Sequence, residues 1–166
     1  DTACVAILIT ELASREKAKG ITLGQYIDTL YDKYGYYRNY LTEIRLPGAM
    51  GMSKMELIQK NLREEPPKSF AGLEIKEIFD FWKGEPFVSE TDKVSRNVLI
   101  MRFKVHEPFG SVQVTIRPSG TEPKTKMYFE IGMLPNDKSD LEQEKIQAES
   151  LLRELEKAVI KYCYKI

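Results

Sequence analysis

The spacing of hydrophobic and polar residues predicts two consecutive helices at the start of the chain. The first should cover residues 2–19 and end at Gly20, because glycine commonly follows the last turn of a helix. The second should run from Thr22 to about Lys33, since Thr22 and Gln25 have the spacing of a capping box. The start of the chain is therefore expected to be helical.

The first predicted helix is more apolar than a surface helix needs to be. A surface helix requires one apolar stripe, whereas the apolar residues here cover most of the circumference. The pattern therefore predicts a second packing partner for this helix. The residues concerned are Ala3, Val5, Ala6, Ile7, Leu8, Ile9, Leu12 and Ala13.

Residues 36–52 show no clean hydrophobic period and contain a Pro-Gly pair, which is typical of a connector and of a domain boundary. A third helix is expected after this connector. It should begin at Ser53, with Glu56 completing a capping box, and end at Glu65, before two consecutive prolines.

Beyond the prolines the hydrophobic period changes to that of β-strands. Val112, Val114 and Ile116 alternate with polar residues, which predicts one buried face and one outward face. A last helix is expected after a capping box that starts at Ser139. Its apolar stripe should consist of Leu141, Ala148, Leu152, Leu155 and Val159. Three or four strands are expected, at about residues 73–81, 97–104, 111–117 and 126–131, with Glu77 interrupting the first.

This order of elements favours an α+β fold. Strands that are grouped together and joined by short connections pair antiparallel, and the flanking helices can then cover one face of the sheet. We therefore expect a mainly antiparallel sheet of about four strands with helices packed on one face. The length of 166 residues fits one domain, or one domain with an appendage.

Composition and charge exclude several classes of protein. The 25 basic and 25 acidic residues balance, which argues against a general nucleic-acid binder. The longest apolar run, residues 3–9, is too short to cross a bilayer. Cys4 and Cys163 are too far apart in the sequence to suggest a disulfide framework or a metal site, so we expect two mostly buried thiols in a reducing cytosol.

The segment between residues 117 and 126 carries the clearest chemical signal. If the two flanking strands pair as a hairpin, Arg117 and Lys126 lie nearly opposite each other on the non-core face. Cations, hydroxyls and a glycine-containing turn can together bind a phosphate group. Ordinary turn chemistry with solvated cations is the alternative that the residues leave open. The candidate phosphate-binding residues are Arg117, Ser119, Gly120, Thr121, Lys124 and Lys126.

The run Arg-Pro-Ser-Gly-Thr-Glu-Pro-Lys at residues 117–124 resembles the phosphate-binding loop of the last domain of the α-D-phosphohexomutases. The continuation to Phe129 is most similar to the bacterial phosphoglucomutase and phosphomannomutase branch. Residues 28–37, 51–55 and 66–70 also resemble this family, so the likeness covers nearly the whole chain.

The resemblance implies a division of the chain into two parts. Residues 38–166 would form the C-terminal phosphate-binding domain, with a TBP-like fold. Residues 1–37 would be the closing helices of the third domain and the interdomain connector, so that the first helix would pack on the rest of that third domain. The family's phosphoserine, magnesium and sugar-binding loops do not occur in this sequence. The chain is thus expected to start just after the sugar-binding loop.

The resemblance also implies a function for the whole enzyme. Members are isomerases that transfer a phosphoryl group between C1 and C6 of a hexose phosphate, through a phosphoserine, Mg²⁺ and a bisphosphate intermediate. By motif match, this domain would bind the phosphate that is not reacting, through Arg117, Ser119, Gly120 and Thr121, with Lys126 and then Lys124 as further choices. The implied protein is cytoplasmic, and its implied partners are the sugar phosphate and the first three domains, with no nucleic acid or membrane.

On this interpretation the chain holds no catalytic residue, binds no metal or cofactor itself and is inactive alone. A different class stays open, namely a stand-alone phospho-ligand-binding or interaction module without catalysis. His106 is the only histidine and is expected to be a bystander, and Trp82 is expected to pack at the core or an edge.

Overall fold

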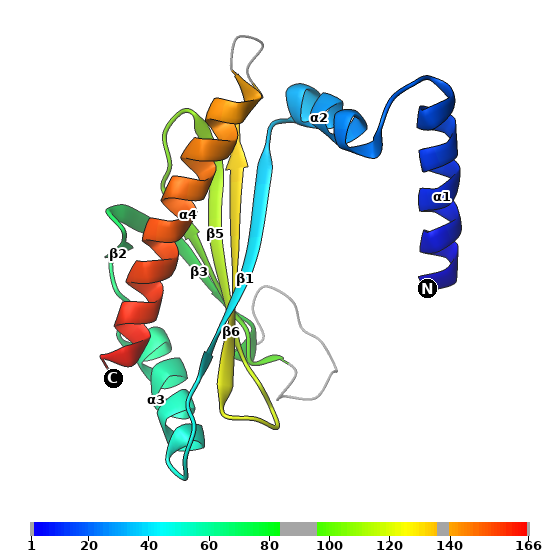
Figure 1. The fold of residues 1–166 in the computed structure, drawn as a ribbon. Coiled ribbons are helices and arrows are strands. Elements are labelled where there is room, and N and C mark those ends of the chain that lie inside the picture. Colours follow the sequence, from blue (N-terminus) through cyan, green and yellow to red (C-terminus); the bar gives the residue numbers. More distant parts are fainter. Residues whose placement is uncertain (1, 84–95, 136–139, 166) are drawn as a thin grey trace.

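The structure is a computed structural model that describes residues 2–83, 96–135 and 140–165 (Figure 1). The described residues form four α-helices, six strands and one short 3₁₀ helix. In chain order these are α1 Thr2–Ala18, α2 Leu23–Tyr34, β1 Tyr37–Arg45, α3 Gly51–Glu64, β2 Ser69–Phe70, β3 Leu73–Asp80, η1 Phe81–Lys83, β4 Leu99–Phe103, β5 Phe109–Pro118, β6 Lys124–Met133 and α4 Leu141–Tyr164.

The strands form one antiparallel sheet in the order β1-β6-β5-β4-β3-β2. Helices α3 and α4 lie along one face of this sheet, as Figure 1 shows. We call the face turned away from these two helices the outer face. The structure confirms the predicted α+β class with an antiparallel sheet, although the described residues contribute six strands to it rather than about four.

The core lies between the sheet and the two helices. The alternating residues Val112, Val114 and Ile116 of β5 are no more than 2% exposed, as the pattern predicted. Helix α4 buries most of its predicted apolar stripe, since it brings residues four and three apart onto one side. Four of its five predicted residues, Ala148, Leu152, Leu155 and Val159, are buried together with Cys163, whereas Leu141 is only half-buried.

The prediction of a connector over residues 36–52 is wrong for its first part, which forms β1. This strand lies at the edge of the sheet and pairs with β6 over its whole length. Only Ile44 of β1 is fully buried, so the strand lacks the apolar alternation that marks a central strand. The edge position therefore explains why the pattern did not show it.

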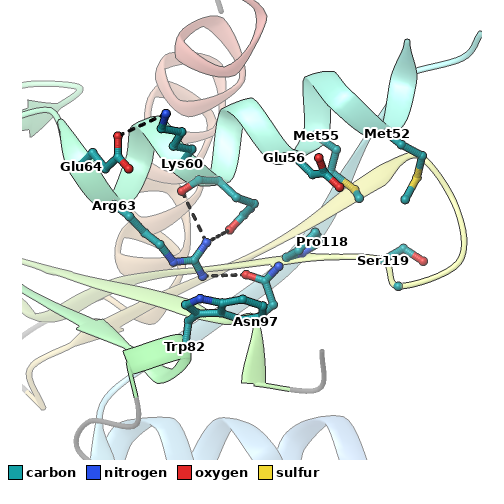
Figure 2. A pocket seen from close by; sticks show the side chains of 12 residues that line it. Met52, Met55, Glu56, Lys60, Arg63, Glu64, Trp82, Asn97, Pro118 and Ser119 are labelled. Carbon is teal, nitrogen blue, oxygen red and sulfur yellow. Dashed lines mark hydrogen bonds and ion pairs between the residues drawn. The ribbon is translucent and has the colours of Figure 1, made fainter. Parts of the chain in front are cut away.

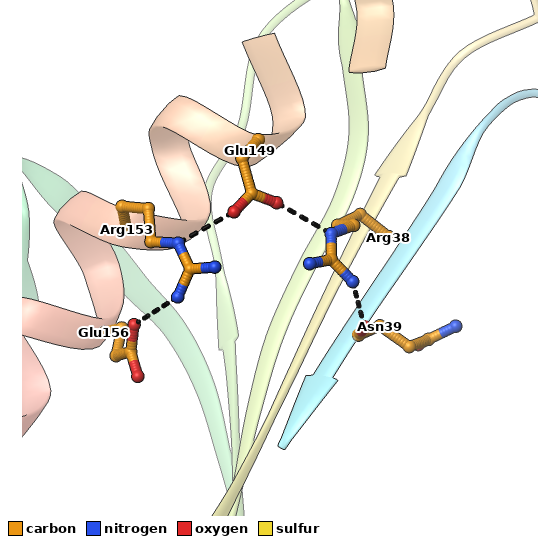
Figure 3. A network of polar contacts seen from close by, with 5 residues as sticks. All are labelled: Arg38, Asn39, Glu149, Arg153 and Glu156. Atoms are coloured by element: carbon orange, nitrogen blue, oxygen red, sulfur yellow. Dashed lines mark hydrogen bonds and ion pairs between the residues drawn. The ribbon is translucent and has the colours of Figure 1, made fainter. Parts of the chain in front are cut away.

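Side-chain contacts also hold β1 to helix α4, as Figure 3 shows. Arg38 Nε donates to Glu149 Oε2 at 2.8 Å, and Glu149 Oε1 accepts from Arg153 Nε at 2.7 Å. The two guanidinium groups hold the pKa of the Glu149 carboxyl below its usual value, chiefly through the hydrogen bond from Arg38. Arg153 also donates to Glu156. This network fastens the edge strand to the helical layer.

The helix ends agree with the sequence at α2 but not at α3. Thr22 and Gln25 form the predicted capping box, and Gly35 ends α2 with a φ of 90°. Helix α3 begins at Gly51 rather than Ser53, and none of the side chains that the structure describes caps its first turn. It ends at Glu64, one residue before the predicted end at Glu65.

The remaining element ends differ from expectation by a few residues. The β3 pairing shifts between Ile75 and Glu77, where the pattern was interrupted, but Phe81 belongs to η1. Helix α4 is capped by Asp140, whose Oδ1 accepts from the Glu142 N–H at 3.0 Å. The predicted cap residue Ser139 lies outside the described residues.

Helix α1 lies away from the sheet and reaches it through α2 (Figure 1). Within the part of the chain that the structure describes, its apolar side chains stay in solvent, with Val5, Ile7 and Leu8 at least 58% exposed. Cys4 is also exposed, contrary to expectation, whereas Cys163 is buried and this burial raises the pKa of its thiol to about 12. No described helix is long and apolar enough to cross a membrane. The division at residue 37 stays a prediction.

Candidate phosphate-binding site

The predicted hairpin geometry is confirmed by the pairing of β5 and β6. Arg117 is directly opposite Lys126, and Pro118 is opposite Thr125. Side chains of directly opposed residues point to the same face of a sheet. Because the adjacent Ile116 is fully buried, Arg117 and Lys126 belong to the outer face. The strands thus bring together two cations that are nine positions apart in the sequence.

The loop that joins the two strands is closed by its own hydrogen bonds. The Ser119 N–H donates to the Lys124 carbonyl at 2.8 Å. Ser119 Oγ accepts from the N–H groups of Thr121 and Glu122, at 3.4 and 3.3 Å. These two contacts are long for hydrogen bonds, so an incoming anion would compete with a weak internal acceptor for both donors. An anion nest at Gly120 stays a prediction.

The loop rests on a rigid base. The Pro123 carbonyl accepts from the Leu46 N–H at 2.8 Å, which ties the loop to the chain segment that leads into α3. Pro118 and Thr125, at the two ends of the loop, are both buried. Gly51 lies so close that a Cβ there would meet Leu46 O at 1.9 Å and Pro123 Cβ at 2.8 Å. The start of α3 therefore helps to set the position of the loop.

The two lysines of the site differ in how they are held. Lys124 forms an ion pair with Glu122, and its side chain is only 19% exposed. The hydrogen bond and charge of Lys124 hold the pKa of the Glu122 carboxyl below its usual value. Among the described residues, neither Arg117 nor Lys126 forms an ion pair. Arg117 and Lys126 thus have charge to offer to an anion.

Strand β1 adds two charged residues that the sequence analysis missed. Glu43 is opposite Lys126, and Arg45 is opposite Lys124, so both lie on the outer face beside the loop. They were missed because this segment was interpreted as a connector. A short signal was present only at the end of the strand, where Glu43 and Arg45 alternate with Ile44 and Leu46, which are 2% and 8% exposed.

A groove on the other side of the loop is lined by Ser119 and Gly120 but not by the remaining predicted residues. Figure 2 shows it between helix α3, with Met52 and Met55, and the side chains of Trp82 and Asn97. The six predicted residues therefore divide between two surfaces. Arg117, Lys124 and Lys126 belong to the outer face of the sheet, and the loop residues lie between this face and the groove.

Arg63 lines that groove, and its guanidinium donates to acceptors of Gln59, Asp80 and Asn97; the contact with Asn97 is drawn in Figure 2. Its Nε donates to Asp80 Oδ1 at 3.1 Å, and Nη2 donates to Asn97 Oδ1 at 2.6 Å. It also lies 5.8 Å from the centre of the Trp82 ring. Because Arg63 and Asp80 are 13% and 10% exposed, this pair acts as a buried structural link between α3 and β3.

No group of three or more His, Cys, Asp or Glu side chains that could hold a metal ion occurs within residues 2–83, 96–135 and 140–165. We assign no metal ligand in the described part of the chain. What the loop region presents is a cationic surface with hydroxyl and backbone donors. Such groups can together bind an anion.

Comparison with known proteins shows which sequences this chain is similar to. The chain is 30% identical over 131 residues to the phosphoglucomutases of Staphylococcus aureus strains MRSA252, N315 and MSSA476. The match covers 79% of this chain and 24% of each relative, so the chain spans about a quarter of the length of these curated relatives. No family model matches the chain. The chain is thus related to a segment of phosphoglucomutase.

Proposed function

We propose that this chain is the C-terminal phosphate-binding domain of a phosphohexomutase. In this role it holds the non-reacting phosphate of a hexose phosphate while the other end of the sugar exchanges a phosphoryl group. The observation that carries the proposal is the placement of Arg117 opposite Lys126 at the two ends of a loop that contains Ser119 and Thr121. The relationship to phosphoglucomutases supports a phosphorylated hexose as the ligand.

The side chains have complementary tasks in this proposal. The Arg117 guanidinium offers a planar fork that matches two phosphate oxygens, and Lys126 adds a point charge from the opposite strand. The Ser119 and Thr121 hydroxyls and the backbone at Gly120 can donate to the third oxygen. Lys124 is already engaged by Glu122, so it contributes charge rather than a direct contact until that ion pair opens.

The whole-enzyme reaction would transfer a phosphoryl group between C1 and C6. A phosphoserine would donate to the free hydroxyl, a bisphosphate would form, and the sugar would turn and return its other phosphate. A site that contacts only a phosphate can bind the sugar in either orientation, because it makes no contact with the ring. Phosphoryl transfer depends mostly on positioning and on charge stabilisation, and this domain would supply the positioning.

The phosphoserine, the magnesium loop and the sugar-binding loop would belong to the first three domains of the whole protein. Mg²⁺ would stabilise charge on the transferring phosphoryl group there. We further propose that the protein is cytoplasmic and that this chain alone has no mutase activity. The exposed apolar side of α1 would pack on the rest of the third domain, to which residues 1–37 would belong.

The proposal can be tested by titrating the isotopically labelled chain with glucose 6-phosphate and following backbone amide shifts by NMR. We expect saturable shifts of residues 117–126, and no shifts with glucose at the same concentrations. Shifts of equal size with glucose would contradict a phosphate-only site. Shifts confined to the groove around Trp82 and Arg63 would place the ligand on the wrong side of the loop and overturn the assignment.

A further inference from the structure

Strand β1 adds charged side chains to the outer face beside the loop. The register places Arg117 opposite Lys126, Lys126 opposite Glu43, and Lys124 opposite Arg45. Neighbouring strands lie about 4.8 Å apart, so side chains at these positions are within reach of a common ligand. The cationic surface therefore extends across β5, β6 and β1.

Arg45 is oriented but still accessible. Its Nε donates to Glu43 Oε1 at 2.7 Å, and its Nη2 lies 2.5 Å from the same oxygen. Because one carboxylate oxygen receives both contacts, Nη1 and one N–H of Nη2 have no partner in this interaction. The Arg45 side chain is 71% exposed. Glu43 thus holds the guanidinium in place while its outer edge remains open to a ligand.

Glu122, an acidic residue of the loop itself, shows that its surroundings favour negative charge. Glu122 forms its ion pair with Lys124, and Arg45 and Lys126 add attraction of their own. These charges hold the pKa of the Glu122 carboxyl below its usual value, with the hydrogen bond from Lys124 as the largest cause. A carboxylate that is attracted by cations from β6 and β1 indicates that the potential is positive at the loop on this side.

We propose that Arg45, positioned by Glu43, is a further phosphate-binding residue of the site at residues 117–126. This inference rests on the proposed function and adds to it a contribution from a strand that lies outside the loop. A phosphate held by Arg117 and Lys126 carries oxygens that those two residues leave free. The open edge of the Arg45 guanidinium donates to one of them, so the anion is bound from three strands.

The test is a titration of the full chain with inorganic phosphate, followed by NMR, for the unchanged protein and two charge-matched variants. Arg45→Gln removes the proposed contact. Arg102→Gln removes an equal charge from the same outer face, where Arg102 is 53% exposed and lies near Glu77. We expect Arg45→Gln to raise the dissociation constant roughly fivefold, as an exposed charge pair allows, and Arg102→Gln to change it by less than twofold.

One further variant and two further measurements separate charge, geometry and folding. Arg45→Lys keeps the charge but loses the planar fork, so we expect it to restore only part of the affinity. All variants should unfold at the temperature of the unchanged chain, because both arginines are exposed. High salt should reduce the difference between Arg45→Gln and the unchanged chain, since the contact is solvent-screened.

The outcomes distinguish this inference from the proposed function. If Arg45→Gln and Arg102→Gln behave alike while Arg117→Ala still loses phosphate binding, the inference about Arg45 is overturned and the loop site stands. If the unchanged chain binds no phosphate at the loop, the proposed function fails and the role of Arg45 fails with it. If Arg45→Lys bound phosphate as tightly as the unchanged chain, the orientation of the planar guanidinium would not matter for binding. That result would contradict the positioning role assigned to Glu43.

Discussion

Gly51 links the fold to the candidate site, and replacing it with alanine should destabilise both. An alanine Cβ would stand 1.9 Å from the Leu46 carbonyl oxygen and 2.8 Å from Pro123 Cβ, distances that van der Waals contact does not allow. The Leu46 carbonyl is part of the backbone, and the N–H of the same residue holds the loop by donating to the Pro123 carbonyl. The start of α3 must therefore move away from the loop or the end of β1 must shift.

The expected cost follows from the type of contact. Forcing an extra methyl group into a packed site typically costs about 1–3 kcal/mol. The cost of a clash with the backbone lies at the upper end of this range, because the backbone cannot relieve the clash by changing a side-chain rotamer. Alanine recovers roughly 0.5–1 kcal/mol relative to glycine in a helix, so we expect Gly51→Ala to lower the free energy of unfolding by about 2 kcal/mol. For a chain of this size, that corresponds to a fall in Tm of roughly 4–8 °C.

Gly24→Ala is the matched control, because Gly24 lies in the first turn of α2 and a Cβ there would come no closer than 3.8 Å to Thr22 Oγ1. This variant should be neutral or slightly stabilising. Urea unfolding followed by circular dichroism measures both, and NMR of the Gly51→Ala variant should show altered amide shifts at residues 119–124. A Gly51→Ala chain as stable as the unchanged protein would refute the argument that this contact sets the loop position.

Three other predictions concern the site and its support. Arg117→Ala should weaken phosphate binding at least tenfold, since a hydrogen bond to a charged group contributes about 1.5–3 kcal/mol, and calorimetric titration measures this. Lys124→Met should raise the pKa of Glu122 toward its ordinary value, which an NMR pH titration measures. In the unchanged chain the Lys124–Glu122 contact is present at neutral pH, and it is lost as the pH falls through the lowered pKa of Glu122. Asp80→Asn should lower the free energy of unfolding by about 3 kcal/mol because it leaves Arg63 short of a buried partner, whereas Glu74→Gln at an exposed pair should change it by less than about 0.5 kcal/mol. Equal effects of Asp80→Asn and Glu74→Gln in denaturant unfolding would contradict the buried role of Arg63.

Much of the fold could be predicted from local pattern. The alternation of Val112, Val114 and Ile116 predicts one buried strand face, and the structure buries all three. The capping box at Thr22 and Gln25 forms as its spacing indicates. These predictions hold because each depends on residues that are close in the sequence, where backbone geometry alone decides which side chains share a face.

Strand β1 could not be predicted in the same way. Its hydrogen bonds go to β6, which follows it by about 80 positions, and its side chains are mostly half-buried or exposed. An edge strand buries little apolar surface, so its sequence shows little alternation of apolar and polar residues. The start of α3 was misplaced for a related reason, since Gly51 is required by contact with Leu46 and Pro123 and not by any capping side chain.

The sequence by itself determined the periods of the central strands, the stripe of α4 and the residues of the candidate loop, because these are properties of short segments. It also carried the resemblance that pointed to phosphate. Only the tertiary structure decided which cations share a surface. Register between strands places Arg117, Lys126 and Arg45 at one end of the outer face, and the ion pair with Glu122 sets Lys124 apart from them. Strand pairing brings distant residues within a few ångströms, and no period in a single segment encodes that distance.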